Sequence, residues 1–163
     1  MVQEIMHLDE EYAEEQRARS LVLRKLARRE YTSIEMLRFL LSEGVSEETS
    51  EKVILDLQSE RILQDEKYTE LFVRAQALKG KGVLWTIKKL AEKGIRVTPE
   101  KVEALLQDAL SVNEEEMIRQ FIQRKYPRAT QDPQEARKAI SGLIRRGFHY
   151  SKIQAVLGRV IQR

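Results

Sequence analysis

Residues 37–45 read Leu37-Arg-Phe-Leu40-Leu41-Ser-Glu-Gly44-Val45, and the same pattern returns as Ile87-Lys-Lys-Leu90-Ala91-Glu-Lys-Gly94-Ile95 and as Ile140-Ser-Gly-Leu143-Ile144-Arg-Arg-Gly147-Phe148. In each copy, apolar residues at positions i, i+3 and i+4 form one face of a helix. The glycine at i+7 fits the left-handed position that follows a helix, because glycine adopts positive φ at little cost. The glycines lie 50 and 53 residues apart, so the chain is predicted to hold three copies of one repeat.

A helix is predicted before and after each copy of this motif. The leading helices are expected at residues 14–29, 66–79 and 114–126, and the trailing helices at residues 47–58, 99–110 and 152–162. Thr32 with Glu35 forms a capping-box pattern, and Thr98, Asp132 and Ser151 are further candidate N-caps. The sequence therefore predicts an all-α fold of three tandem three-helix repeats that resemble helix-turn-helix units. Because each unit alone buries little surface, we expect the repeats to stack into an elongated, curved array.

The motif spacing also predicts the organisation of the chain. An acidic N-terminal tail over residues 1–16 precedes repeats over residues 17–64, 65–112 and 113–163. Lys79–Gly82 and Tyr126–Asp132 are the expected flexible joints. The apolar face of the second leading helix is predicted to include Tyr68, Leu71, Phe72, Ala75 and Leu78.

The composition excludes several classes of protein. The chain has no cysteine, which rules out disulfides, thiolate metal sites and a cysteine nucleophile. No stretch approaches the roughly 18 apolar residues of a membrane span. The N-terminus is acidic, whereas a signal peptide begins with basic residues followed by an apolar run. These features predict a cytoplasmic protein.

The net charge of +3 conceals a polarised layout. Residues 1–16 hold six acids and no base, and residues 17–29 hold six bases and no acid. Residues 117–163 hold 11 bases against Asp132 and Glu135. The basic segments predict a polyanionic or acidic partner, although solvated helix faces are the simpler alternative. One hypothesis for the acidic segment is that it mimics DNA or covers the protein's own basic groove.

The sequence offers little for catalysis. His7 and His149 belong to no metal-ligand spacing, and both are expected to be surface residues. Phosphate-binding glycine loops and the nucleophile-elbow pattern are absent. Acid runs such as 114–116 fit the first turn of a helix, where they interact favourably with the dipole. We therefore expect a protein that is not an enzyme and needs no cofactor or metal.

Basic residues are the better candidates for function. They gather at helix ends and on the middle helices, and the predicted contact residues are Arg24, Lys25, Arg28, Arg29, Lys88, Lys89, Arg124, Lys125, Arg145 and Arg146. Cations at helix C-termini also interact favourably with the dipole, which explains part of the pattern without any ligand. Trp85 and Tyr126 lie among these cations and could stack on a base, anchor a protein contact, or pack in the repeat core.

Three segments resemble the RecX family, in the family's order. They are Arg29-Glu-Tyr-Thr-Ser-Ile-Glu35-Met-Leu37; Leu63-Gln-Asp65-Glu-Lys-Tyr68-Thr-Glu-Leu-Phe72-Val with Lys81-Gly82 and Leu90–Ile95; and Lys138 with Leu143-Ile-Arg145-Arg146-Gly147-Phe148 and Ile153. The resemblance runs from about Arg17 to the C-terminus. It departs from the family pattern at Met36, at Gln64 and throughout residues 1–16.

The resemblance implies a negative regulator of the RecA recombinase, acting in DNA repair, homologous recombination and the SOS response. Such a protein would lie in the groove of RecA filaments on single-stranded DNA. There it would suppress ATP hydrolysis, strand exchange and coprotease activity by blocking growth or promoting disassembly. Its partners would be the RecA filament and, weakly, single-stranded DNA, and it would be a monomer. The alternatives are a stand-alone helix-turn-helix DNA-binding protein, which would usually be dimeric, and a helical adaptor.

Overall fold

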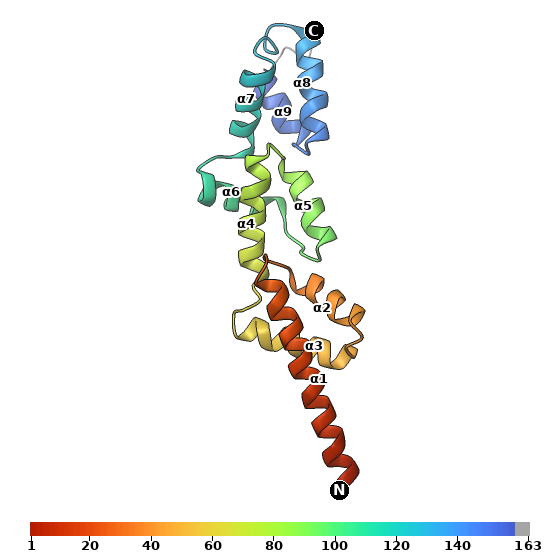
Figure 1. Ribbon diagram of the computed structural model, residues 1–163. Coiled ribbons are helices and arrows are strands. Elements are labelled where there is room, and N and C mark those ends of the chain that lie inside the picture. The colour runs from red at the N-terminus through yellow and green to blue at the C-terminus, as the bar shows by residue number, and fades with distance from the viewer. Residues whose placement is uncertain (159–163) are drawn as a thin grey trace. The chain divides into compact units, whose positions relative to one another are not determined.

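The computed structural model describes residues 1–158, and every regular element in that range is a helix. In chain order the helices are α1 (Val2–Leu26), α2 (Ser33–Ser42), α3 (Glu47–Ser59), α4 (Asp65–Leu78), α5 (Val83–Glu92), α6 (Pro99–Leu110), α7 (Glu114–Lys125), α8 (Pro133–Arg145) and α9 (Tyr150–Leu157) (Figure 1). The all-α prediction is confirmed. The three motif copies lie on α2, α5 and α8, each the middle helix of a set of three.

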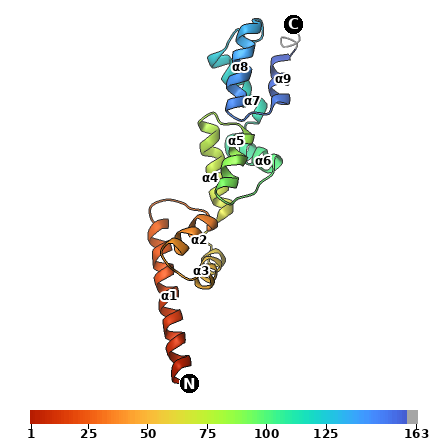
Figure 2. The same ribbon diagram turned by 90° about the vertical axis from the view of Figure 1, so that its right-hand side faces the viewer.

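Contacts divide the chain into two units. Unit 1 comprises Met1–Tyr68 together with Lys93–Ile95, and unit 2 comprises Thr69–Glu92 and, of the described residues, 96–158. In unit 1, α1, α2 and α3 pack against one another, as the two ribbon views show (Figures 1 and 2). In unit 2, α5 packs on α6, and α7, α8 and α9 form a second three-helix group.

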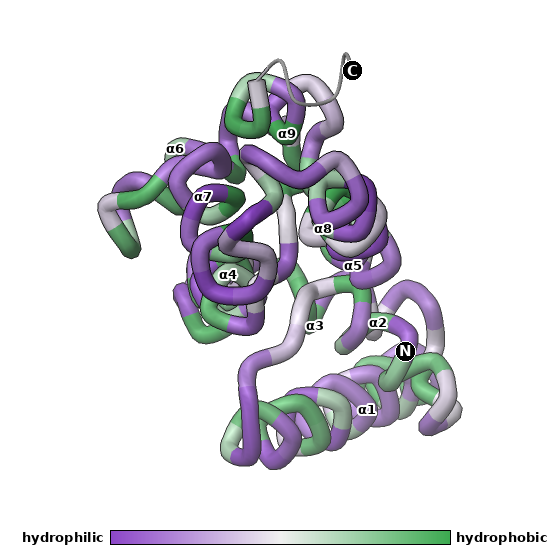
Figure 3. The backbone as a smooth tube through the Cα atoms, turned by 90° about the horizontal axis from the view of Figure 1, so that it is seen from above, coloured by the Kyte–Doolittle hydropathy of each residue, from purple (hydrophilic) through white to green (hydrophobic). Residues whose placement is uncertain are grey.

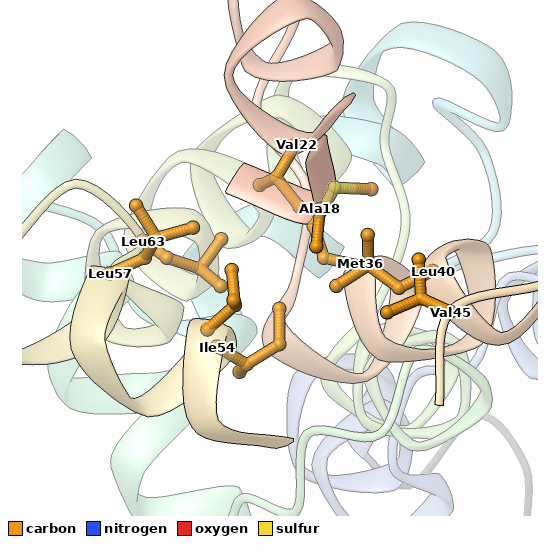
Figure 4. Close-up of a cluster of buried hydrophobic side chains, with 9 residues drawn as sticks. Ala18, Val22, Met36, Leu40, Val45, Ile54, Leu57 and Leu63 are labelled. Atoms are coloured by element: carbon orange, nitrogen blue, oxygen red, sulfur yellow. The ribbon is translucent and has the colours of Figure 1, made fainter. Parts of the chain in front are cut away.

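Each three-helix group at the ends of the chain has its own apolar core. Along the backbone, apolar positions alternate with polar ones, as expected for helices with one buried face (Figure 3). The unit 1 core contains Ala18, Val22, Met36, Leu40, Val45, Val53, Ile54, Leu57 and Leu63, so all three helices contribute (Figure 4). The α7–α9 core contains Ile118, Phe121, Ile122, Ala129, Ala139, Leu143, Phe148, Ile153 and Leu157.

The glycine that closes each motif ends its helix as predicted. Gly44, Gly94 and Gly147 have φ angles of +80°, +82° and +80°. After α2 and α8, the N–H of the next residue bonds back to the helix: Val45 to the carbonyl of Leu40, and Phe148 to that of Leu143. This is the Schellman arrangement, and it buries Val45 and Phe148 against the last helical turn.

Three of the four predicted caps are confirmed. Thr32 accepts a hydrogen bond from the Glu35 N–H while the Glu35 carboxylate accepts one from the Thr32 N–H, which completes the capping box. The side chains of Thr98 and Asp132 cap α6 and α8. The Ser151 cap is wrong, because α9 begins at Tyr150 with His149 as its N-cap.

Other boundaries and faces also differ from the prediction. The first helix begins at Val2, so most of the acidic segment belongs to α1. The last trailing helix was expected to run to residue 162, but α9 ends at Leu157 and residues 159–163 lie outside the described range. On α4, Leu71 and Leu78 are 49% and 70% exposed instead of buried. The residues that α4 does bury are Tyr68, Thr69, Val73 and Gln76.

Candidate protein and nucleic-acid interface

The turn after α8 docks on the start of α5, within unit 2. The N–H groups of Gly82 and Leu84 donate to the carbonyl oxygens of Arg146 and Gly147 at 2.8 and 2.9 Å. A Cβ on Gly147 would lie 2.4 Å from the backbone nitrogen of Trp85. This contact, the α8–α5 junction, fixes Arg145 and Arg146 relative to α5. The Lys79–Gly82 segment predicted to be flexible is thereby held by hydrogen bonds.

The turn after α5 docks on the start of α2 in the same way, within unit 1. The Thr32 hydroxyl donates to the carbonyl oxygen of Lys93 at 2.7 Å. The ammonium of Lys93 is 2.8 Å from the Glu35 carboxylate. A Cβ on Gly94 would come within 2.5 Å of the Ile34 side chain. This is the α5–α2 junction.

The ion pair of the α5–α2 junction shifts the pKa values of both Glu35 and Lys93. Burial raises the pKa of Glu35, but hydrogen bonds from Lys93 and from the Thr32 N–H, with the nearby positive charges, outweigh burial and lower the pKa below its ordinary value of 4.5. The hydrogen bond to Glu35 raises the pKa of Lys93 above 10.5, against the opposing effect of burial. Both groups are therefore charged near neutral pH.

One buried carboxylate lies at the α8–α5 junction. Glu114, in the first turn of α7, is fully buried and accepts hydrogen bonds from the N–H groups of Val83 and His149 at 3.1 and 3.4 Å. Its other oxygen is 2.6 Å from Nδ1 of His149 and 3.6 Å from the ammonium of Lys152. Glu114 thus binds the starts of both α5 and α9.

Glu103, Glu114 and His149 are the described residues closest to a metal-ligand set, with their ligand atoms within 4.8 Å of one another. Lys152 also contacts Glu103, so its ammonium supplies a cation between the two carboxylates. Burial lowers the pKa of Lys152. The cluster is best explained as a helix cap with its counter-charge. The prediction that His149 is a plain surface residue is wrong, since its side chain is only 25% exposed.

The four predicted contact residues at the end of α1 form one basic cluster with aromatic neighbours. The ammonium of Lys25 lies 4.3 Å from the Phe39 ring centroid, and the Arg29 guanidinium lies 3.6 Å from that of Tyr31. Arg24, Arg28 and Arg29 are exposed. These cation–π contacts contribute about 0.5–1 kcal/mol each at exposed sites and order the cluster on the surface.

A second cluster lies on α5 around Trp85. The ammonium groups of Lys81 and Lys89 lie 4.9 and 5.9 Å from the indole ring, while Lys88 is exposed. Trp85 is partly exposed and contacts Gly147 through its backbone and Cβ, so it belongs to the α8–α5 junction and not to a repeat core. Lys89 is also paired with Glu92 at 2.8 Å. Lys81 was not among the predicted contact residues; it lies in the turn just before α5, four residues before Trp85.

The third cluster, the Tyr126 cleft, has a volume of about 340 Å³ and is lined by Tyr126, Arg137, Lys138, Ser141 and Arg145. Lys125 lies beside it, with its ammonium 5.7 Å from the Tyr126 ring. Arg137 and Lys138 were not among the predicted contact residues. Their spacing from Arg145 places all three on one side of α8. A partly exposed aromatic ring among cations is the arrangement that binds phosphates and stacks bases in single-strand-binding proteins.

Arg124 and Arg146 meet in a separate cavity of about 410 Å³, which we call the Arg124 pocket. Arg146 is partly structural. Its guanidinium lies 5.1 Å from the Phe121 ring and donates weakly to the carbonyl oxygens of Lys79 and Gly80. The structure therefore brings Arg124 together with Arg146, and it places Lys125 and Arg145 each beside Tyr126. It leaves Lys88 and Lys89 on α5 in a cluster of their own.

Three-helix sets joined by docked glycine turns, with basic and aromatic clusters on their surfaces, define a helical-repeat protein. No helix among residues 1–158 is long and apolar enough to cross a bilayer. Residues 113–157 match the family model described as RecX, third three-helix domain.

Relatives match over most of the chain. The regulatory protein RecX of Mannheimia succiniciproducens is 30% identical, with 79% of this chain and 84% of the relative aligned. That of Halorhodospira halophila is 28% identical over 91% of each. This protein belongs to the RecX family of regulatory proteins. It spans only 55% of the RecX of Streptococcus sanguinis, to which it is 27% identical. The crystal structure of RecX from Lactobacillus salivarius shares the fold, with a TM-score of 0.76 at 20% identity and 93% coverage of this chain.

Proposed function

We propose that this protein is a non-catalytic negative regulator of RecA that binds RecA filaments on single-stranded DNA. Membership of the RecX family carries the proposal, because the family's relatives are named as regulatory proteins. The basic and aromatic clusters supply surfaces of the right chemistry. Cations attract phosphates or acidic protein surface, and partly exposed rings can stack on bases.

In the proposed mechanism, the clusters contact the filament, and the α8–α5 junction holds the clusters of α5 and α8 at fixed spacing within unit 2. Binding biases the filament only if the protein prefers one of its states, since equal affinity for two states shifts nothing. A preference for a state that does not add or retain RecA subunits would block growth or promote disassembly. ATP hydrolysis, strand exchange and coprotease activity would fall together because all three depend on the filament.

Direct binding tests the proposal. Fluorescence anisotropy would compare a labelled single strand, bare or coated with RecA and a non-hydrolysable ATP analogue, with labelled duplexes. The protein is expected to bind the coated strand most tightly, and its affinity should fall as salt rises. Tight binding to one duplex sequence would instead indicate a helix-turn-helix regulator. Equal, weak binding to every probe would contradict filament recognition.

A matched pair of variants distinguishes the contribution of the Tyr126 cleft to filament affinity from that of positive charge in general. The cleft variant carries Arg137→Glu, Lys138→Glu and Arg145→Glu. The control carries Arg74→Glu, Arg96→Glu and Lys101→Glu, which are exposed and change the net charge equally. Arg146 is left intact because it contacts Phe121. We expect the cleft variant to lose at least about tenfold in filament affinity and the control much less. Equal losses would remove the cleft from the proposal.

A further inference from the structure

The first three turns of α1 carry an apolar stripe that is open to solvent. Met1, Ile5, Leu8 and Tyr12 follow the i, i+4, i+7, i+11 spacing of one helix face, and each is more than half exposed. Val2 and Met6, next to this stripe, are also more than half exposed. Such a concentration of exposed apolar side chains is typical of a contact surface.

The stripe lies off the face by which α1 packs in unit 1. Acids that follow the stripe bind α3: Glu14 accepts hydrogen bonds from Ser46 and Thr49, and Glu15 pairs with Lys52. The N-terminal turns extend past α2 and α3 in both ribbon views (Figures 1 and 2). Unit 1 therefore holds α1 through residues that follow the stripe and leaves the stripe itself more than half exposed.

The Arg124 pocket, in unit 2, has the complementary chemistry. Its apolar walls are formed by Leu78, Leu110, Val112, Met117, Phe121 and Phe148. Lys79, Arg124 and Arg146 also line it, and no acid does. Its volume of about 410 Å³ is within the range of cavities that bury small ligands, so it can hold a few apolar side chains.

We propose that the Arg124 pocket of one copy of this protein receives the N-terminal stripe of a second copy. Charge complementarity singles out this occupant. Residues 1–10 carry Glu4, Asp9 and Glu10 and no base, and Asp9 lies one helical turn after Ile5 and Met6. Neither Asp9 nor Arg124 has an ion-pair partner among residues 1–158. Docking gives each a partner as the stripe leaves water.

The contact is heterologous, because the surfaces that meet are different. Repetition builds a ring if the rotation between copies closes and an open chain if it does not. Self-association therefore depends on protein concentration, and the protein is a monomer only when dilute. This proposal is independent of the proposed function, since it involves neither RecA nor DNA.

Sedimentation velocity of the full chain over a range of concentrations tests the proposal. We expect the average mass to rise with concentration. Arg124→Glu should raise the concentration at which association begins by about tenfold or more, since it places like charges together. Lys88→Glu, an exposed reversal outside the pocket, is the matched control and should behave as wild type. A chain that stays monomeric throughout, or association unaffected by Arg124→Glu, would overturn the proposal.

A charge swap gives the sharper result. Asp9→Arg alone should weaken association as Arg124→Glu does, and the double variant Asp9→Arg/Arg124→Glu should regain it. Both positions are exposed, so folding should be intact, and circular dichroism would check it. Failure of the double variant to regain association, with folding intact, would show that Asp9 and Arg124 do not meet.

Discussion

The two junctions use the same motif at the same place but differ in chemistry. At the α5–α2 junction, side chains make the contacts: the Thr32 hydroxyl, the Glu35–Lys93 ion pair, and the Asp65 carboxylate, which accepts from the N–H of Ser33 at 2.8 Å. At the α8–α5 junction, two backbone hydrogen bonds join the turn to the helix. There Glu114, fully buried, takes the place of Asp65.

The two junctions share one contact, from a first-turn acid, and differ in how the glycine turn docks. In both junctions an acid from the first turn of the next leading helix accepts a hydrogen bond from the first residue of the middle helix. This contact joins each repeat to the one before it. The turn that docks beside it can use side chains or backbone, because a glycine lets the two chains approach closely. The α8–α5 junction should tolerate a side chain at its glycine less well than the α5–α2 junction, because backbone atoms cannot move aside as a side chain can.

Gly147→Ala should have the largest effect. The new Cβ would meet backbone and Cβ atoms of Trp85 at 2.4 Å, and the residue would keep a φ of +80°. We expect the free energy of unfolding to fall by about 2–5 kcal/mol. Gly44→Ala is the control, since Gly44 has the same φ with nothing within 4 Å, and should cost about 1–2 kcal/mol. Gly94→Ala should fall between them. Equal losses at all three in urea unfolding would refute the difference between junctions.

Removal of the capping acids comes next. Glu114→Ala should cost about 2–4 kcal/mol, because it leaves the buried N–H groups of Val83 and His149 without their acceptor and removes one of the two carboxylates beside Lys152. Asp65→Ala removes a cap from Ser33 in a less buried setting and should cost about 0.5–2 kcal/mol. Chemical denaturation of both variants measures the order. A larger loss for Asp65→Ala would show that Glu114 is not the stronger link.

The smallest expected effect is the pH dependence of the stability that the α5–α2 junction contributes. The pKa of Glu35 is lowered in the folded state. Glu35 therefore stabilises the fold at pH values above the ordinary pKa of 4.5, and this stabilisation is lost as the pH falls through the folded-state pKa. Lys93 has a raised pKa, so its contribution is lost only above 10.5. Between about pH 6 and pH 3, wild type should lose about 1 kcal/mol more stability than Glu35→Gln.

Glu66→Gln, at an exposed acid, is the control for that experiment and should follow wild type. Urea unfolding at each pH gives the free energies. Parallel curves for wild type and Glu35→Gln would mean that the ion pair does not stabilise the fold.

The local parts of the fold were predictable from the sequence. The motif glycines, the Thr32–Glu35 capping box and the Thr98 cap depend on residues a few positions apart, and all were confirmed. The face of α4 was predicted less well. Leu71 and Leu78 continue an apolar period, yet Thr69 and Gln76 are buried in their place, because neighbouring helices determine which face is covered.

The residues of the candidate site likewise include some that the sequence predicts and some that depend on packing. Basic residues at helix ends are visible in the sequence, so the α1 cluster and Arg145 could be predicted. The Tyr126 cleft could not, because Arg137 and Lys138 reach Tyr126 only after α7 and α8 have packed. Glu114 resembled an ordinary first-turn acid beside two others, and only its burial and its contacts with Val83 and His149 distinguish it.

The most direct test of the functional account is RecA's ATP hydrolysis on single-stranded DNA, with this protein titrated from far below one molecule per RecA. Strong inhibition at substoichiometric ratios is predicted, and the cleft variant (Arg137→Glu, Lys138→Glu and Arg145→Glu) should need at least about tenfold more protein for the same inhibition. Unchanged hydrolysis at equimolar wild-type protein, with filaments confirmed by electron microscopy, would contradict the account.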